Sequence, residues 1–503
     1  MNVLLITILT TLAGLPDGVV LEDHHLGVVP RTAEEAARIG AVVAPAREFD
    51  ALEQFETNPA GKATLWSKPG RTSFSQPSAS MEFDRKLDFE LGKAMFEKLW
   101  VGSPSSNLAS DGLGPIFNAR SCRACHMADG RGSLALSENS NISLLLRLSV
   151  PAQLASVSDE IEGFLSTLPE PTYGTQFQDR SVPGMEPEGR FEVSYAEEPV
   201  RLSDGEVVYL RRPTYSFTEL NYGPMDEDTM VSPRIAQQMI GLGLLDAIPA
   251  ADILAHADPE DLDGDGISGR PQIVPSKEFG VPMLGRFGHK ATEPSLYEQT
   301  AAAFHGDIGI STWMLPEGYG ECTARQTDCR DAPDGNTEVH GNVEIPQNAL
   351  DLTVFFAGNL AVPTRRGADD PEVLRGKEIF YTAGCTGCHV PKFVTARLED
   401  RPEHSIQLIW PYSDMLLHDM GPDLADNRPV GMANGQEWRT PPLWGIGLTE
   451  TVSGHTHFLH DGRARSLLEA ILWHGGEAAP HKQRVVEMPK SDRDALIRFL
   501  ESL

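Results

Sequence analysis

Long hydrophobic runs, basic residues and cysteines are all scarce in this 503-residue chain. After the first dozen residues, no stretch approaches the roughly 18 apolar residues that a transmembrane helix needs, so we expect no membrane span. Only 42 Lys and Arg oppose 72 Asp and Glu, and the resulting net charge of −30 argues against binding to nucleic acid. The six cysteines are not needed as staples, because a chain of this length can bury large cores without them.

Length and composition predict a globular protein of about two to four domains. The hydrophobic fraction of 40% and the charged fraction of 23% argue against disorder. A short apolar run from Val3 to Leu9, followed by small residues, predicts a signal peptide over residues 1–20. A buried N-terminal strand is the alternative, because no Lys or Arg precedes the run.

Four of the six cysteines stand in two copies of one pattern. The copies read Cys122-Arg-Ala-Cys125-His126 and Cys385-Thr-Gly-Cys388-His389. Two thiols three positions apart can form thioethers to the two vinyl groups of one porphyrin, and the adjacent histidine then becomes the proximal ligand of the iron. We therefore predict two covalent c-type haems with His126 and His389 as iron ligands. Because such attachment happens outside the cytoplasm, we expect a periplasmic or otherwise exported protein.

Other interpretations of the cysteines are weaker. Zinc needs four cooperating ligands, commonly at close sequence range, whereas the two cysteine pairs lie 263 positions apart. A thioredoxin-like redox pair gives no reason for the histidine that follows each pair. The remaining Cys322 and Cys329 predict a short-loop disulfide in an oxidising compartment, with a thiolate ligand to a haem iron as the alternative.

The order of elements predicts a mainly α fold with two cytochrome-c-like haem domains and a long, partly extended insertion that contains a small β element. Apolar residues at helical spacing over 87–99 predict a helix before the first motif, and segments 91–96 and 374–380 look like an internal repeat. We expect a hairpin over 190–220, a helix opening at Ser232-Pro233 and an amphipathic helix at the C-terminus. The expected domains are a wrap or linker (21–80), a first haem unit (81–190), the insertion (191–365) and a second haem domain (366–503).

An acidic loop in the insertion resembles the first half of a calcium site. Asp261, Asp263 and Asp265 place oxygen ligands at alternate positions, with glycines to turn the loop. The glutamate expected at the twelfth position is missing, because Gln272 stands there. A bound Ca²⁺ would need a further ligand such as Asp258, and an acidic surface turn is the alternative.

Several longer segments are similar to one known family. They are 111–118 before the first motif, 232–245 with 263–270, and 438–444, 459–464 and 469–474 near the C-terminus. Together they resemble the bacterial di-haem oxidoreductases, labelled peroxidases or thiol oxidoreductases and distantly related to di-haem cytochrome c peroxidases. The similarity runs from about Leu87 to the C-terminus. It implies reduction of hydrogen peroxide with electrons from a small redox protein, such as a cytochrome c or a cupredoxin. The alternatives are a di-haem electron-transfer protein without its own substrate, and oxidation of a sulfur compound.

The resemblance also implies roles for single residues. His474 stands where the related peroxidases carry the distal ligand of the second haem, so we expect it to bind that iron; a surface histidine is the alternative. His418 and Met420 are reserve ligands. No comparable histidine follows the first motif, so the first iron is expected to be open to peroxide or capped from the insertion. The candidates for that cap are His289, His305, Met283 and Met314.

Two further residues are candidates by the same resemblance. The segment Ser295 to Asp307 resembles the stretch that supplies a catalytic glutamate in the relatives, which makes Asp307 the candidate acid–base group. Trp444 lies in a segment that approaches the haems in the relatives, so it is the candidate aromatic bridge between them. The alternatives are a capping or surface carboxylate for Asp307 and a packing role for Trp444.

Overall fold

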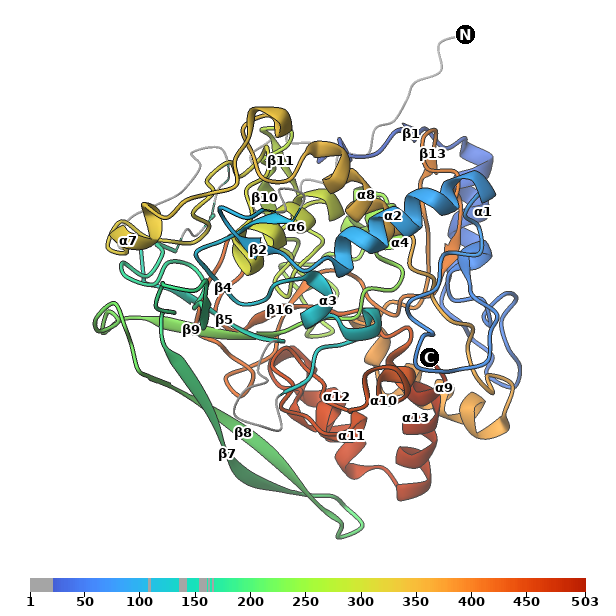
Figure 1. The fold of residues 1–503 in the computed structure, drawn as a ribbon. Coiled ribbons are helices and arrows are strands. Elements are labelled where there is room, and N and C mark those ends of the chain that lie inside the picture. The colour runs from blue at the N-terminus through green and yellow to red at the C-terminus, as the bar shows by residue number, and fades with distance from the viewer. Residues whose placement is uncertain (1–20, 107–109, 135–142, 153–160, 162, 165–166) are drawn as a thin grey trace.

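The computed structural model describes residues 21–106, 110–134, 143–152, 161, 163–164 and 167–503 (Figure 1). The predicted signal peptide lies outside the described residues. In the part of the chain that is described, no helix is long and apolar enough to cross a membrane.

The fold is not mainly α, and that prediction is wrong. Helices account for 29% of the structure and strands for 19%, and the strands within the described residues form eight two-stranded sheets. Glycine and proline explain much of this mixture: 46 Gly and 37 Pro interrupt helical stretches, and short strand pairs tie the irregular connections together. Nothing in the arrangement of the described elements identifies cytochrome-c-like domains.

Most helices are short. They are α1 (Ala33–Val43), α2 (Lys86–Glu97), α3 (Cys122–Cys125), α4 (Leu242–Asp246), α5 (Ala250–Leu254), α6 (Leu296–Ala303), α7 (Thr327–Arg330), α8 (Gln347–Gly358), α9 (Pro371–Thr382), α10 (Thr449–Ser453), α11 (Leu467–Trp473), α12 (Ala479–Glu487) and α13 (Lys490–Ser502). A π-helical turn, η4 (Phe304–Ile308), follows α6 directly.

The strands pair two by two, and among the described sheets only β2 with β3 is parallel. The pairs are β1 (Val28–Val29) with β13 (Arg397–Leu398), β2 (Val101–Gly102) with β3 (Asp111–Leu113), β4 (Ile116–Phe117) with β6 (Arg180–Ser181), β5 (Leu144–Ser149) with β9 (Met230–Ile235), β7 (Arg190–Arg201) with β8 (Val207–Thr218), β10 (Ile273–Pro275) with β11 (Pro282–Leu284), β12 (Phe393–Val394) with β14 (Leu408–Ile409), and β15 (Leu417–Asp419) with β16 (Glu437–Arg439).

Two helix pairs repeat the same packing. α2 crosses α8, and α9 crosses α13. Gly92 of α2 lies against the carbonyl oxygen of Leu352, and Gly376 of α9 lies against that of Ala495. A Cβ at either glycine would collide with the partner backbone, so each crossing requires the absence of a side chain.

A phenylalanine four residues after each glycine completes the repeat. The ring centroids of Phe96 and Phe356 are 5.2 Å apart across the first crossing, and those of Phe380 and Phe499 are 5.2 Å apart across the second. The internal repeat between segments 91–96 and 374–380 is therefore confirmed in the packing. The domain boundaries predicted from the sequence stay a prediction.

The helix predicted before the first motif is confirmed as α2, but its apolar stripe does not face the core. Leu87 is 67% exposed and Leu99, just after the helix, is 62% exposed, whereas Phe89, Gly92 and Phe96 are buried against α8.

The hairpin predicted over 190–220 is also confirmed. β7 and β8 form a long ribbon that projects along one edge of the molecule (Figure 1). Its base buries Phe191 in the core cluster that contains β5, and its tip buries Leu202 and Leu210 among residues of α12 and α13. The hairpin thus connects two distant parts of the fold.

The helix expected at Ser232-Pro233 is not formed, and that prediction is wrong. Both residues lie in β9, where Ser232 pairs with Arg147 and Pro233 with Leu146 of β5. Pro is tolerated because β9 has only one partner strand and keeps an edge free.

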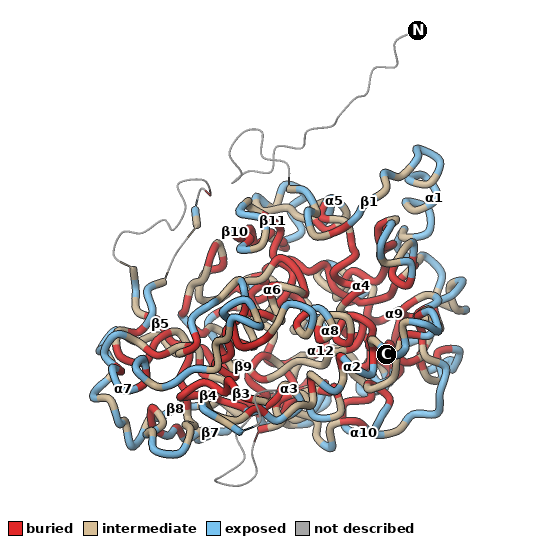
Figure 2. Tube along the Cα trace, turned by 45° about the horizontal axis from the view of Figure 1, so that its top comes forward, coloured by how far each residue is buried: buried red, intermediate tan, exposed pale blue. Residues whose placement is uncertain are grey.

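Residues 21–80 pack against the C-terminal half of the chain. β1 pairs with β13, and the buried Glu56 forms ion pairs with Arg365 and Lys377. Helix α1 lies at the periphery and buries none of its side chains (Figure 2).

The glycine crossings yield a stability test. Gly92→Ala and Gly376→Ala should each lower the free energy of unfolding by about 1–3 kcal/mol or more, because the added methyl forces the helices apart. Gly40→Ala in α1 is the control: nothing lies within 4 Å of a Cβ there, so helix propensity alone should raise stability by up to about 1 kcal/mol. Urea unfolding followed by circular dichroism measures all three. Equal effects at the three sites would contradict the crossing argument.

Candidate functional site

Both cysteine–histidine motifs line one cavity of about 660 Å³. The motif residues in its wall are Cys122, Cys125, His126, Cys385, Cys388 and His389. Segments from most of the chain contribute the remaining wall, from Phe96 after the first glycine crossing to Leu500 in α13. The two motifs, although 263 positions apart in sequence, therefore share one internal space.

The two motif histidines are held in the same way. Nδ1 of His126 donates to the carbonyl oxygen of Gln237 at 2.7 Å, and Nδ1 of His389 donates to that of Tyr412 at 2.9 Å. Each imidazole ring lies 6.2 Å from the repeat phenylalanine, Phe96 or Phe380, measured between centroids. Burial lowers the pKa of both histidines to about 4, so both rings are neutral near pH 7. The fixed tautomer leaves the Nε2 lone pair as the available metal ligand.

His474 follows the same pattern from the end of α11. Its Nδ1 donates to the carbonyl oxygen of Ala470 at 2.8 Å, and burial lowers its pKa. It lines the cavity, and its charge contributes to the lowered pKa of His389. The structure therefore brings His474 and His389 together, while the role of His474 as distal ligand stays a prediction.

Of the two reserve ligands, Met420 lines the cavity and stays a prediction, whereas His418 is less suitable. His418 uses both ring nitrogens on carboxylates, at 2.7 Å to Asp414 and 2.8 Å to Glu477, and has no lone pair to offer. His289 lines the cavity, but Nε2 donates to Ile235 and Nδ1 accepts from Gln237. His305, Met283 and Met314 are not among the residues that line the cavity.

Asp307 lies beside the first motif. It is placed by η4, lines the cavity, and accepts a hydrogen bond of 2.9 Å from Nε2 of Gln176. Its negative charge raises the pKa of both Cys122 and Cys125, which shows how close it lies to them. Burial raises the pKa of Asp307 itself. The carboxyl group is thus near the motif and more easily protonated than a surface aspartate.

Glu293 is a second carboxyl group in the cavity, and no sequence pattern indicated it. Its side chain is 15% exposed, and its ion-pair partner is Nζ of Lys277 at 3.8 Å, a side chain that is half exposed. Burial raises the pKa of Glu293 to about 7, and Lys277 opposes this shift only in part. A group with this pKa can release and take up a proton near neutral pH.

The tryptophan that lines the cavity is Trp438, not Trp444. Trp444 is buried in the apolar core against Gly241 and Val362. Trp438 stacks on His460 at 3.8 Å between ring centroids, with the ammonium group of Lys290 4.8 Å from its ring. Any aromatic contact to the cavity from segment 438–444 is therefore made by Trp438, and the bridging role of Trp444 stays a prediction.

The cavity wall is strongly basic although the protein is acidic. The described cationic residues in it are Arg131, Arg147, Arg234, Arg286, Arg428, Arg439 and Lys482, against the two carboxyl groups Glu293 and Asp307. Arg131 and Arg439 donate to backbone carbonyls but form no ion pair with a described carboxylate. Burial lowers the pKa of each to about 10.

Buried guanidinium groups without a counter-ion are costly. A haem brings two propionate carboxylates, an apolar macrocycle and an iron that accepts a neutral imidazole. The cavity offers matching groups for each: cations, apolar wall residues and the Nε2 atoms of the two motif histidines. The residues present therefore fit haem groups.

A zinc site fits less well. Burial raises the pKa of Cys122 and Cys385 to about 12, which disfavours the thiolates that zinc binds. Among the described residues, the motif cysteines and histidines do not form a group of three ligands around one point.

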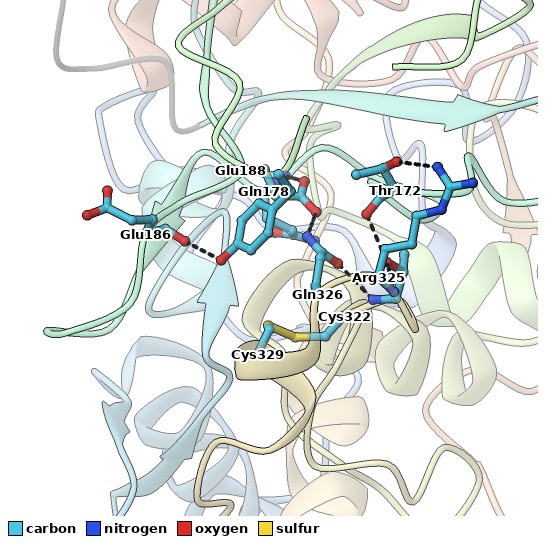
Figure 3. The surroundings of a disulfide bond; sticks show 10 residues. Thr172, Gln178, Glu186, Glu188, Cys322, Arg325, Gln326 and Cys329 are labelled. Carbon is cyan, nitrogen blue, oxygen red and sulfur yellow. Dashed lines mark hydrogen bonds between the residues drawn. A yellow bond between two sulfur atoms is a disulfide. The ribbon is translucent and has the colours of Figure 1, made fainter. Parts of the chain in front are cut away.

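Cys322 and Cys329 form the predicted disulfide and are not among the cavity-lining residues (Figure 3). Between them, Gln326 donates from Nε2 to the buried Glu188 at 2.7 Å. The disulfide loop therefore braces the segment around residues 172–188, and the alternative of a thiolate ligand has no support.

The acidic loop brings carboxylates together. Oxygen atoms of Asp258, Asp261 and Asp263 lie within 4.8 Å of one another, and Asp265 is not part of this group. Asp265 instead accepts a hydrogen bond from the backbone of Ile267 at 2.8 Å. The structure thus supplies Asp258 as the expected extra ligand, and Ca²⁺ in this loop stays a prediction.

A fold with two CxxCH motifs on one basic cavity defines a protein built around two haem groups. The comparison with protein families agrees, because residues 56–503 match the family described as "Di-haem oxidoreductase, putative peroxidase". The chain belongs to this family, which makes it an oxidoreductase with two haems at the level of the family description. No curated protein matches the chain.

Glu293 yields a pH test. Its pKa is about 7 in the folded protein and about 4.5 when unfolded, so protonation favours folding. This contribution is present below about pH 4.5 and is lost as the pH rises through 7, a difference of about 3 kcal/mol. Glu293→Gln should therefore gain stability relative to the parent between pH 5 and 8, measured by urea unfolding. Glu90→Gln on the exposed face of α2 is the control, and a constant difference across this range would contradict the assignment.

Proposed function

We propose that the protein is an exported di-haem c-type peroxidase that reduces hydrogen peroxide with electrons from a small redox protein. The observation that carries the proposal is the shared basic cavity, which both CxxCH motifs line with an oriented, neutral histidine. In this proposal the four motif cysteines hold the haems by thioethers, which supports export because such attachment takes place outside the cytoplasm.

The haems supply the one-electron chemistry when bound. Reduction of one H₂O₂ to two H₂O consumes two electrons and two protons. Asp307 beside the first motif and Glu293 in the same cavity are the groups that hold and deliver protons. The half-exposed Lys277, next to Glu293, gives that carboxyl group a connection to solvent. Asp307 is the proton-carrying group that lies beside a motif, which makes the first motif the proposed peroxide site.

The second motif is the proposed electron relay. His389 and His474 are both buried, neutral and bonded through Nδ1, which suits two axial ligands on one iron. The net charge of −30 favours a basic electron donor such as a small cytochrome. Oxidation of a sulfur compound loses its support, since the cysteines expected to provide the thiolate ligand are joined in a disulfide.

Electron paramagnetic resonance of the ferric protein tests the assignment of the two sites. We expect one high-spin and one low-spin signal, because His289 is hydrogen-bonded through both ring nitrogens and His305 does not line the cavity, whereas the second motif has His474. The denatured protein should retain two haems by mass, and only one after Cys122→Ala with Cys125→Ala. Two low-spin signals, with no turnover of peroxide, would favour the electron-transfer alternative instead.

His474→Gly tests the second haem separately. Loss of the distal ligand should convert its low-spin signal to high-spin and shift its absorption spectrum, and added imidazole should restore both. His481→Gly is the control, since His481 also lines the cavity but its Nδ1 bonds the carbonyl of Ala383 at the C-terminal end of α9, two residues before Cys385. An unchanged spectrum in the His474 variant would refute its assignment.

A further inference from the structure

A buried charge triad lies directly behind the second motif. His418 of β15 is 2% exposed and bonds Asp414 through Nε2 at 2.7 Å and Glu477 through Nδ1 at 2.8 Å. Burial by itself would lower the pKa of His418, but the charge of Asp414 raises it well above the ordinary value. A carboxylate oxygen lies within hydrogen-bond distance of each ring nitrogen, so both nitrogens donate and the ring is an imidazolium between two carboxylates.

The triad is attached to the motif at two points. Nδ1 of His418 lies 3.5 Å from Sγ of Cys388, and the backbone N–H of Asp414 donates to the carbonyl oxygen of Cys388 at 3.0 Å. Glu477 is fixed on its far side by the hydroxyl of Ser268 at 2.6 Å and by the backbone N–H of Asp419 at 3.1 Å. The three charges are therefore held in place next to the cysteine that precedes the iron-binding histidine.

We propose that the Asp414–His418–Glu477 triad sets the reduction potential of the second haem, with His418 as a positioning residue that acts by its fixed positive charge. This inference rests on the proposed function only in requiring a haem on Cys385 and Cys388. A nearby positive charge stabilises the ferrous form and a negative charge stabilises the ferric form. Because two carboxylates face one imidazolium, the triad holds the second haem toward the ferric state.

Among the described residues, no equivalent triad adjoins the first motif. His289 is linked to His126 through Gln237, whose side-chain amide donates to Nδ1 of His289. Nε2 of His289 donates to the carbonyl oxygen of Ile235, so neither bond involves a carboxylate. The described surroundings of the two motifs therefore differ in fixed charge although their histidines are oriented alike. That difference provides a reason for unequal potentials in two sites built on one repeat.

The test compares two substitutions of opposite charge. His418→Gln removes the positive charge and should lower the potential of the second haem, whereas Glu477→Gln removes a negative charge and should raise it. A unit charge at roughly 10 Å, with an effective dielectric constant of about 20, changes an equilibrium by roughly tenfold or somewhat more. A tenfold change corresponds to about 59 mV for one electron. Spectroelectrochemical titration of the haem-loaded protein measures both haems separately.

A control variant separates charge from folding. His25→Gln alters another buried histidine–carboxylate pair, His25 with Asp246, whose histidine does not line the large cavity. It should leave both potentials unchanged. Shifts of opposite sign at the second haem alone would support the inference. Shifts of the same sign, or none, in protein that carries two haems would overturn it, while protein that retains no covalent haem would instead refute the proposed function.

Discussion

The contact on which the rest of the structure depends is the close approach of two helix backbones at a glycine, made once at Gly92 and once at Gly376. Each crossing sets the position of the phenylalanine one turn later, and that ring packs both on the partner helix and beside the motif histidine. The orientation of each motif histidine therefore depends on a backbone contact more than ten residues away in sequence. A larger side chain at the crossing would disturb the site without touching it.

The second constraint is electrostatic. Burying guanidinium groups such as those of Arg131 and Arg439 without a direct ion pair costs free energy, of which the nearby Asp461 and Asp414 offset a part. Carboxylates of a bound group would offset more of this cost and would couple the stability of the fold to its cofactor. In the proposed function, the acidic surface attracts a basic donor, whereas the basic cavity attracts anionic groups.

Features that depend on a few neighbouring residues could be predicted from the sequence. The CxxCH motifs, the hairpin and the helix before the first motif were all recognisable, because each depends on spacing over a few residues. The partner of each element was not recognisable: the spacing of Leu87 predicted a helix but not which face is buried, and Phe89 and Phe96 face α8, some 260 residues later. Ser232 lies in a strand for the same reason, since only pairing with β5 makes that segment extended. The prediction of a mainly α fold was wrong because such non-local strand pairings are frequent in this protein.

Some residues of the candidate site could also be predicted from the sequence and others could not, and the charged groups around the two motifs differ. Resemblance located Asp307 close to the first motif, but no pattern marks Glu293, whose pKa is raised by burial among distant segments and by the charge of Glu298. Burial raises the pKa of Asp307 beside the first motif, and Glu293 in the same cavity can exchange protons near neutral pH. Beside the second motif, His418 is held between Asp414 and Glu477 in mutual ion pairs. Peroxide reduction needs protons where oxygen is reduced, whereas electron relay works best where no charge moves with the electron. This asymmetry, imposed on two halves with the same helix packing, favours peroxide chemistry at the first motif and electron relay at the second.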